Sequence, residues 1–97
     1  MMNSKQEKLD ENTTKEVILL QSQTSCNMAV CFFLQKNYKK AIEKATESLK
    51  LNKNDKALYR RGQAYAALQN YDEAVEDFKN LIKMDTSDKN NFQQELV

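Results

Sequence analysis

Apolar side chains recur every three or four residues along most of the chain. This spacing is typical of amphipathic α-helices, which turn once every 3.6 residues. Short polar stretches interrupt it at "QKNY", "NKND" and "QNYD", and the last two of these offer turn or cap residues. The pattern predicts helices at 17–34, 38–51, 56–68 and 71–84.

The ends of the pattern indicate where the folded part begins and stops. The stretch "TTKE" resembles a capping box, with Thr13 as the N-cap and Glu16 reaching back to it. Residues 1–12 are polar and are expected to be disordered. After "DTSD", a last short helix is expected over 88–97, carrying Phe92 and Leu96 inward.

The two middle pairs of helices repeat each other at an offset of 33 residues. Asn37-Tyr38 falls on Asn70-Tyr71, and Ala41 falls on Ala74. A helix–turn–helix unit with this period indicates an all-α solenoid. The single glycine of the chain, Gly62, lies inside the third helix, where a small residue allows another helix to approach, and we expect that approach at Ala74.

Residues 55–88 resemble a tetratricopeptide repeat, and residues 22–54 resemble a weaker copy. The stronger repeat has residues of the expected size at Leu58, Gly62, Tyr65, Ala74, Phe78 and Leu81. The weaker copy has Ser25, Ala29, Phe32, Ala41, Ala45 and Ser48 at these places. The resemblance implies antiparallel helical hairpins in residues 13–97, with about two repeats and a C-terminal capping helix at 88–97.

Charge and cysteine usage narrow the class of protein. The chain has a net charge of +1 and no histidine, which disfavours a general nucleic-acid or membrane-binding role. Residues 36–61 carry nine basic and three acidic side chains, whereas residues 72–88 carry two basic and six acidic ones. The two cysteines, Cys26 and Cys31, cannot face each other on one helix and indicate a reducing compartment. With no signal peptide pattern and a longest apolar run of "MAVCFFL", we expect a cytoplasmic protein that does not cross a membrane.

Catalysis is disfavoured by the residues that are absent. Without histidine, the common acid–base, nucleophilic and metal sites lack their usual residue, and there is no CxxC or glycine-rich phosphate loop. The adjacent Glu76 and Asp77 are expected on an exposed helix face. We therefore expect no enzyme, no cofactor and no metal.

A binding site is predicted on the first helix of each repeat, which lines the concave groove of tetratricopeptide arrays. Lys56, Arg60 and Gln63 share one face of the third helix, and the groove positions one repeat earlier include Asn27 and Val30. Arg61 lies on the packing face instead, and its guanidinium is expected to reach water.

The set Asn27, Lys56 and Arg60 resembles the later part of the carboxylate clamp in chaperone-binding tetratricopeptide domains. The wording "CNMAVCFFLQKNYKKAI" is most similar to the large immunophilins and the myosin-folding co-chaperones. The resemblance implies binding of the acidic C-terminal peptide of a heat-shock chaperone. Such a clamp also takes a lysine and an asparagine from a preceding repeat, and no repeat signature surrounds Lys5, Lys8 or Asn12. The chain is therefore interpreted as a fragment, an isoform or half of an oligomer.

Two other interpretations remain open at the level of sequence. The chain could be a structural scaffold that binds a partner helix or a second copy of itself, with Val30, Phe33, Leu34 and Tyr59 as an apolar lining. The basic residues 36–61 could also form a nucleic-acid surface, but they contain only Tyr38 and Tyr59 for base stacking. We expect a peptide or protein partner, with a homodimer as one form, and no nucleic acid.

Overall fold

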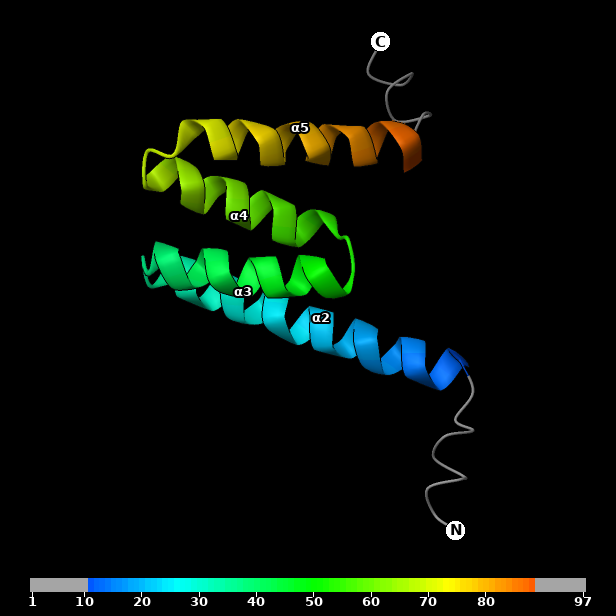
Figure 1. Ribbon diagram of the computed structural model, residues 1–97. Helices are drawn as coiled ribbons and strands as arrows, with labels where there is room; N and C mark the ends of the chain where they lie inside the picture. Colours follow the sequence, from blue (N-terminus) through cyan, green and yellow to red (C-terminus); the bar gives the residue numbers. More distant parts are fainter. Residues whose placement is uncertain (1–10, 89–97) are drawn as a thin grey trace.

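The computed structural model describes residues 11–88, with side chains as far as Met84. All four elements in this range are α-helices, which confirms the predicted all-α class for the described part of the chain (Figure 1). The helices are α2 (Glu11–Leu34), α3 (Tyr38–Leu51), α4 (Asp55–Ala67) and α5 (Tyr71–Asp88).

The helix bounds differ from the predicted ones mainly at the outer ends. The helix α2 begins at Glu11, so Thr13 lies in its first turn and the predicted N-cap at Thr13 is wrong. Asn12, which was assigned to the disordered segment, is helical as well. The helix α5 continues past the predicted end at residue 84, through "DTSD", to Asp88. Serine and threonine lower helix propensity only slightly, and this stretch contains no glycine or proline to end the helix. The predicted capping helix lies outside the described residues beyond Asp88.

The turns after α2 and α4 have the same backbone hydrogen bonds, shifted by 33 residues. Asn37 N–H donates to the Phe32 carbonyl at 2.8 Å, and Asn70 N–H donates to the Tyr65 carbonyl at 2.8 Å. The residue before each asparagine, Lys36 or Gln69, has a positive φ of 65° or 66°. This is the Schellman arrangement that ends many helices, here with a side chain where glycine is usual.

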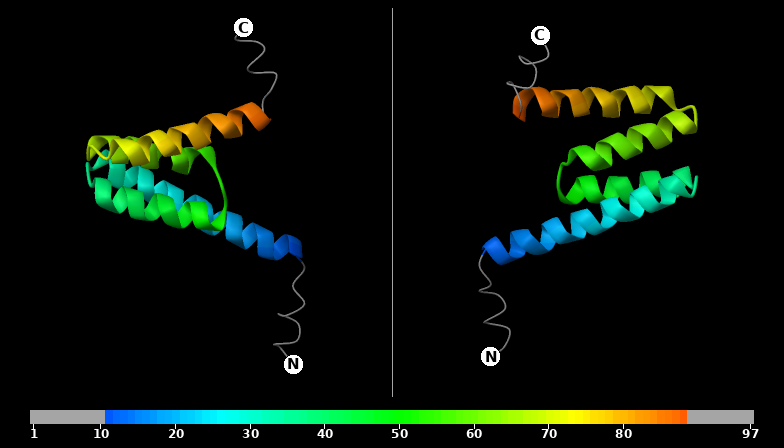
Figure 2. Two further views of the ribbon diagram at one scale, coloured as in Figure 1. Left: turned by 45° about the horizontal axis from the view of Figure 1, so that its top comes forward. Right: turned by 180° about the vertical axis from the view of Figure 1, so that it is seen from behind.

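The helices stack in chain order, from α2 at the bottom of Figure 1 to α5 at the top, and each one packs on the next (Figures 1 and 2). Besides these neighbours, α2 contacts α4, whereas α3 and α5 do not contact each other. The side formed by α2 and α4 is therefore the inner side of the curve, and the side formed by α3 and α5 is the outer side. This confirms the arrangement expected of a tetratricopeptide solenoid.

The core consists largely of small side chains, which let the helices approach closely. Among the described residues, five alanines are completely buried: Ala29, Ala41, Ala45, Ala57 and Ala64. One cluster joins three of the helices through Cys26, Ala29, Ala45 and Ala57, with Leu49 against it. The second helix pair is tied to the first through this cluster.

Gly62 packs against the paired helix α5, as predicted, and the atoms nearest to it belong to the ring of Phe78, where the sequence had suggested Ala74. A Cβ atom at Gly62 would be 2.8 Å from Cε1 and 2.9 Å from Cζ of Phe78. The Phe78 ring also packs edge-on against Tyr59, with ring centroids 6.4 Å apart. Gly62 is therefore small because Phe78, one turn beyond Ala74 on α5, occupies the space that its side chain would need.

Arg61 does not end in water, so that prediction was wrong. Its Nε donates to Oδ2 of Asp77 at 2.8 Å and its Nη2 to Oδ1 at 2.7 Å, while Nη1 donates to Thr46 Oγ1 at 3.1 Å. Asp77 is 2% exposed, which also corrects its assignment to a solvated face. The hydrogen bond to Asp77 is the largest reason that the pKa of Arg61 is raised. One guanidinium thus joins α3, α4 and α5.

By length and composition, α2 could also cross a membrane, which the short run "MAVCFFL" did not indicate. It contains an 18-residue window with a mean hydropathy of 1.4, and only 17% of that window is buried. The core helix of a soluble protein passes the same test, so one such helix is weak evidence. In this fold Ser22, Cys26 and Ala29 are buried on the side of α2 that faces the rest of the molecule.

Candidate functional site

A cavity of about 440 Å³ opens on the inner side, between α2 and the start of α4. Asn27 and Lys56, two of the predicted site residues, line it together although they are 29 positions apart. The other lining residues are Leu19, Ser22, Gln23, Cys26, Asn52, Asn54 and Asp55. The cavity therefore presents amide groups, one ammonium and one carboxylate.

The start of α4 is held in place by a buried polar network. Ser48 Oγ donates to the Ser22 carbonyl at 2.8 Å, and the Asn54 side chain donates to Ser48 Oγ at 3.1 Å. Asn54 Oδ1 then accepts from Ala57 N–H at 2.8 Å, as an N-cap does. This network fixes the first turn of α4, which carries Lys56, against both α2 and α3.

Arg60 lies one turn further along α4 and is half-buried against aromatic rings. Its guanidinium carbon is 5.2 Å from the centre of the Phe33 ring and 5.8 Å from that of Tyr59. Its Nη1 donates to Gln63 Oε1 at 3.4 Å. The rings hold the guanidinium in one region of the inner face without neutralising it, and its remaining N–H groups can donate to an anion.

The electrostatic surroundings of Cys26 show that both cations lie near the cavity. Burial raises the pKa of the Cys26 thiol, and the charges of Lys56 and Arg60 oppose that rise. Asp55 acts in the same direction as burial. Because the net shift is upward, Cys26 remains a protonated thiol and is not an activated nucleophile. Its role here is to form one wall of the cavity.

The five predicted site residues lie on the inner side but do not form one cluster. Asn27 and Lys56 share the cavity, whereas Arg60 and Gln63 pair with each other beyond its lining. Val30, on α2, is half-buried. No finding tests what these residues bind, so their role stays a prediction.

Sequence reasoning missed two polar members of the cavity, Gln23 and Asp55. Gln23 lies one turn before Asn27 on α2, and the 33-residue offset relates it to Lys56 just as it relates Asn27 to Arg60. Applying the 33-residue offset to Lys56 as well as to Arg60 would have identified Gln23. Asp55 places a carboxylate beside Lys56 and lowers the positive potential of the cavity.

Comparison with known proteins supports the predicted repeat. Residues 56–88 match the tetratricopeptide repeat model. The chain is 34% identical over 79 residues, 80% of its length, to FK506-binding protein 59 of Drosophila melanogaster. It is 32% identical over 76 residues, 77% of its length, to the peptidyl-prolyl cis-trans isomerase FKBP4 of Mus musculus. It is 40% identical over 62 residues, 63% of its length, to the peptidyl-prolyl cis-trans isomerase PASTICCINO1 of Arabidopsis thaliana.

These alignments cover only a small part of each relative. The chain spans 18%, 17% and 10% of the three proteins, respectively. No solved structure gives a significant match to the chain. The chain thus carries a tetratricopeptide repeat, which is a protein-interaction module and not a catalytic domain, and the predicted resemblance to large immunophilins is confirmed.

Proposed function

We propose that this module binds the acidic C-terminal peptide of a heat-shock chaperone, with the peptide carboxylates held on the inner side of α2 and α4. The observation that carries the proposal is the shared cavity of Asn27 and Lys56, with Arg60 stacked one turn away. A terminal aspartate presents two carboxylates within a few ångströms of each other. An ammonium, a guanidinium fork and an amide together match that pair of anions.

The arrangement of Arg60 supports this use. The rings of Phe33 and Tyr59 already restrict its side chain, so less conformational entropy is lost when it binds a carboxylate. Phe33 and Tyr59 also offer apolar surface for the peptide residues that precede the carboxylates. The similarity to FK506-binding protein 59 and to FKBP4 agrees with the predicted resemblance to large immunophilins, which implies the same class of partner.

The first experiment compares two forms of one peptide by isothermal titration calorimetry. A peptide ending in Glu-Glu-Val-Asp is titrated as the free acid and as the C-terminal amide. We expect micromolar binding of the free acid, at least tenfold weaker binding of the amide, and weakening of both with added salt. Equal affinities for the two forms would exclude recognition of the terminal carboxylate.

The second experiment assigns the binding to individual residues. Charge-assisted hydrogen bonds are worth roughly 1.5–3 kcal/mol, so Lys56→Ala and Arg60→Ala should each weaken binding by about 10- to 150-fold. Lys53→Ala is the matched control, because Lys53 is exposed, lies three residues before Lys56 and lines a different cavity with Leu58 and Met84. An equal loss with Lys53→Ala would show that only the general positive field matters.

Arg60→Lys separates charge from geometry. Lysine keeps the positive charge but loses the planar fork and the stacking on Phe33. We expect an affinity between that of the natural chain and that of Arg60→Ala. Full affinity of Arg60→Lys would contradict a bidentate contact with the peptide.

A cytoplasmic location forms part of the proposal. Both cysteines are free, with Cys26 buried and Cys31 exposed, which suits a reducing compartment. Cell fractionation with an antibody against the chain tests it, and recovery of the protein in a membrane pellet after a salt wash would contradict it.

A further inference from the structure

The first and last described helices each expose a face whose equivalent inside the molecule is covered by another helix. On α4, Ala57 and Ala64 are completely buried and Arg61 bonds to Thr46 of α3. The 33-residue offset relates Ala57, Arg61 and Ala64, in this order, to Thr24, Met28 and Cys31 of α2. These three residues of α2 are all exposed. We call Thr24, Met28 and Cys31 the N-end face.

The same comparison applies to α3 and α5. Tyr38, Ile42 and Leu49 of α3 are half-buried, and Leu49 packs on the cluster that contains Ala57 of α4. Their equivalents on α5 are Tyr71, Val75 and Ile82, which are 59%, 49% and 59% exposed. We call the first two of these residues, Tyr71 and Val75, the C-end face.

From this relationship we infer that two copies of the chain join head to tail, with the C-end face of one copy on the N-end face of the next. Within the molecule, α3 packs on α4. The C-end face of α5 is the counterpart of the α3 side of that contact, and the N-end face of α2 is the counterpart of its α4 side. Joining them therefore continues an interface that the fold already contains. Within residues 11–88 no helix covers either face.

The shapes of the two faces fit this arrangement. The N-end face forms part of a hollow of about 340 Å³, lined by Thr24, Met28 and Cys31 with Asn27, Phe32 and Gln35. The C-end face offers aromatic and aliphatic side chains, from Tyr71 and Val75 respectively, that can enter an apolar hollow. Exposed apolar side chains that are grouped in this way are typical of interaction surfaces.

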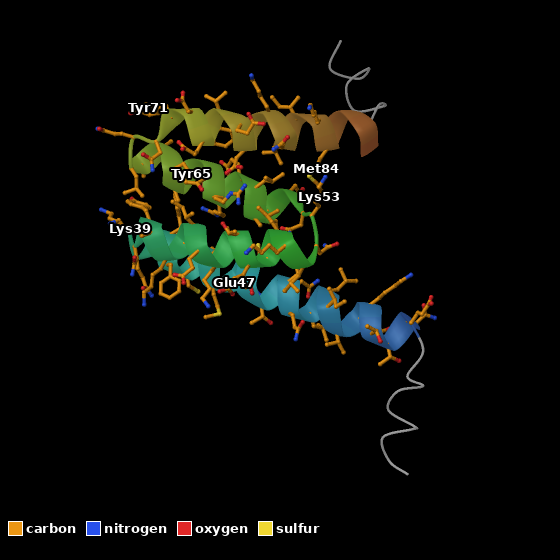
Figure 3. All side chains as sticks on the ribbon, viewed as in Figure 1. Lys39, Glu47, Lys53, Tyr65, Tyr71 and Met84 are labelled. Carbon is orange, nitrogen blue, oxygen red and sulfur yellow. The ribbon has the colours of Figure 1, made fainter. Side chains whose placement is uncertain are left out.

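Charge also favours a head-to-tail contact over a symmetric one. The exposed charged residues at the start of α5 are acidic (Asp72, Glu73 and Glu76), whereas the exposed charged residues at the junction of α2 and α3 are basic (Lys36, Lys39 and Lys40). Figure 3 shows Lys39 and Tyr71 at the same end of the molecule. In a head-to-tail stack the acidic group of one copy meets the basic group of the next, whereas a symmetric contact brings like charges together.

Sedimentation velocity tests the contact on the full chain with one variant for each face. Met28→Glu removes the N-end face and Val75→Glu removes the C-end face, and Lys50→Glu is a control at an exposed position of α3. We expect the natural chain and Lys50→Glu to grow in mass with concentration from the 11.3 kDa monomer. Each face variant alone should stay a monomer.

The decisive sample is an equal mixture of the two face variants. Met28→Glu keeps its C-end face and Val75→Glu keeps its N-end face, so one such contact remains and the mixture should reach twice the monomer mass and stop there. Monomers in the mixture, association of either variant alone, or a natural chain that stays monomeric at its highest soluble concentration would each overturn the inference. Circular dichroism confirms that each variant is folded, and Thr24→Arg and Tyr71→Glu replace a variant that is not.

Discussion

The two helical hairpins share one backbone design but hold their helices together by different chemistry. In the hairpin of α2 and α3, serine hydroxyls cross the interface, with Ser22 Oγ donating to the Ser48 carbonyl at 3.0 Å. In the hairpin of α4 and α5, an aromatic ring fills the space above Gly62 and a buried ion pair joins Arg61 to Asp77. The position equivalent to Asp77 is Lys44, which makes an exposed contact with Glu47 at 3.4 Å.

This difference shows which part of the repeat pattern determines the fold. The turn geometry and the small residues at helix crossings are common to both hairpins, whereas the polar contacts are not. Residues 56–88 match the family model, and residues 22–54 form an equivalent hairpin. Four sets of variants test how far the two hairpins are equivalent, in order of decreasing effect.

The largest difference in the free energy of unfolding is expected between variants of Asp77 and of its equivalent, Lys44. Asp77→Ala leaves the guanidinium of Arg61 without its partner and should lower the free energy of unfolding by about 3 kcal/mol. Lys44→Ala removes only an exposed ion pair and should cost less than about 0.5 kcal/mol. Urea denaturation followed by circular dichroism measures both. A similar cost for the two variants would show that the buried pair contributes little to stability.

The next largest difference concerns the only glycine. In Gly62→Ala the new methyl group meets the Phe78 ring, and overpacking should cost about 1–3 kcal/mol despite the better helix propensity of alanine. Adding Phe78→Leu should recover part of that loss. The equivalent residue of the first hairpin is already alanine, Ala29, which is completely buried. A higher melting temperature in Gly62→Ala would show that contact with the Phe78 ring does not require glycine at this position.

A smaller loss is expected from the serine network of the first hairpin. Ser48→Ala removes an acceptor for Asn54 and a donor to Ser22, and should cost about 1–2 kcal/mol. Ser25→Ala, on the same helix as Ser22 but only half-buried, is the control and should change stability little. Hydrogen exchange should also speed up at the start of α4 in Ser48→Ala, because that turn is held through Asn54. Unchanged exchange there would mean that the network does not position α4.

The smallest effect tests where the two hairpins are alike. Lys36→Gly and Gln69→Gly relieve a left-handed backbone conformation and should each stabilise the chain by about 1 kcal/mol. Because the two turns have the same hydrogen bonds, the gains should be equal and additive. Thermal denaturation of the two single variants and the double variant checks this. Unequal gains would show that the turns differ more than their backbones suggest.

Local features of the fold were predictable, and contacts between helices were predictable only in part. The apolar spacing gave all four helices, and α3 from Tyr38 to Leu51 has the predicted bounds. The 33-residue offset predicted that the four helices form two equivalent hairpins. The ion pair of Arg61 was missed because it depends on how α4 crosses α5. Asp77 lies three residues after Ala74, on the same helix face, and that spacing was the signal that it points inward.

The candidate site was predictable to a similar extent. The positions of Asn27 and Lys56 followed from the repeat, and the structure brings them to one cavity. The stacking of Arg60 on Phe33 was not foreseen, because it joins residues of two different repeats. Sequence spacing places residues on a helix face, but the distance between two faces depends on the packing of the side chains beneath them.

The pattern of helix contacts also has a consequence for how the chain folds. Among the four described helices, each one contacts its neighbours along the chain, and one additional contact joins α2 to α4. Most native contacts therefore form between segments that are close in sequence, which favours rapid folding. A hairpin can form first and serve as the surface on which the next helix orders. Because the contact between α3 and α4 is less extensive than the contact within either hairpin, the two hairpins are expected to separate from each other before either one opens.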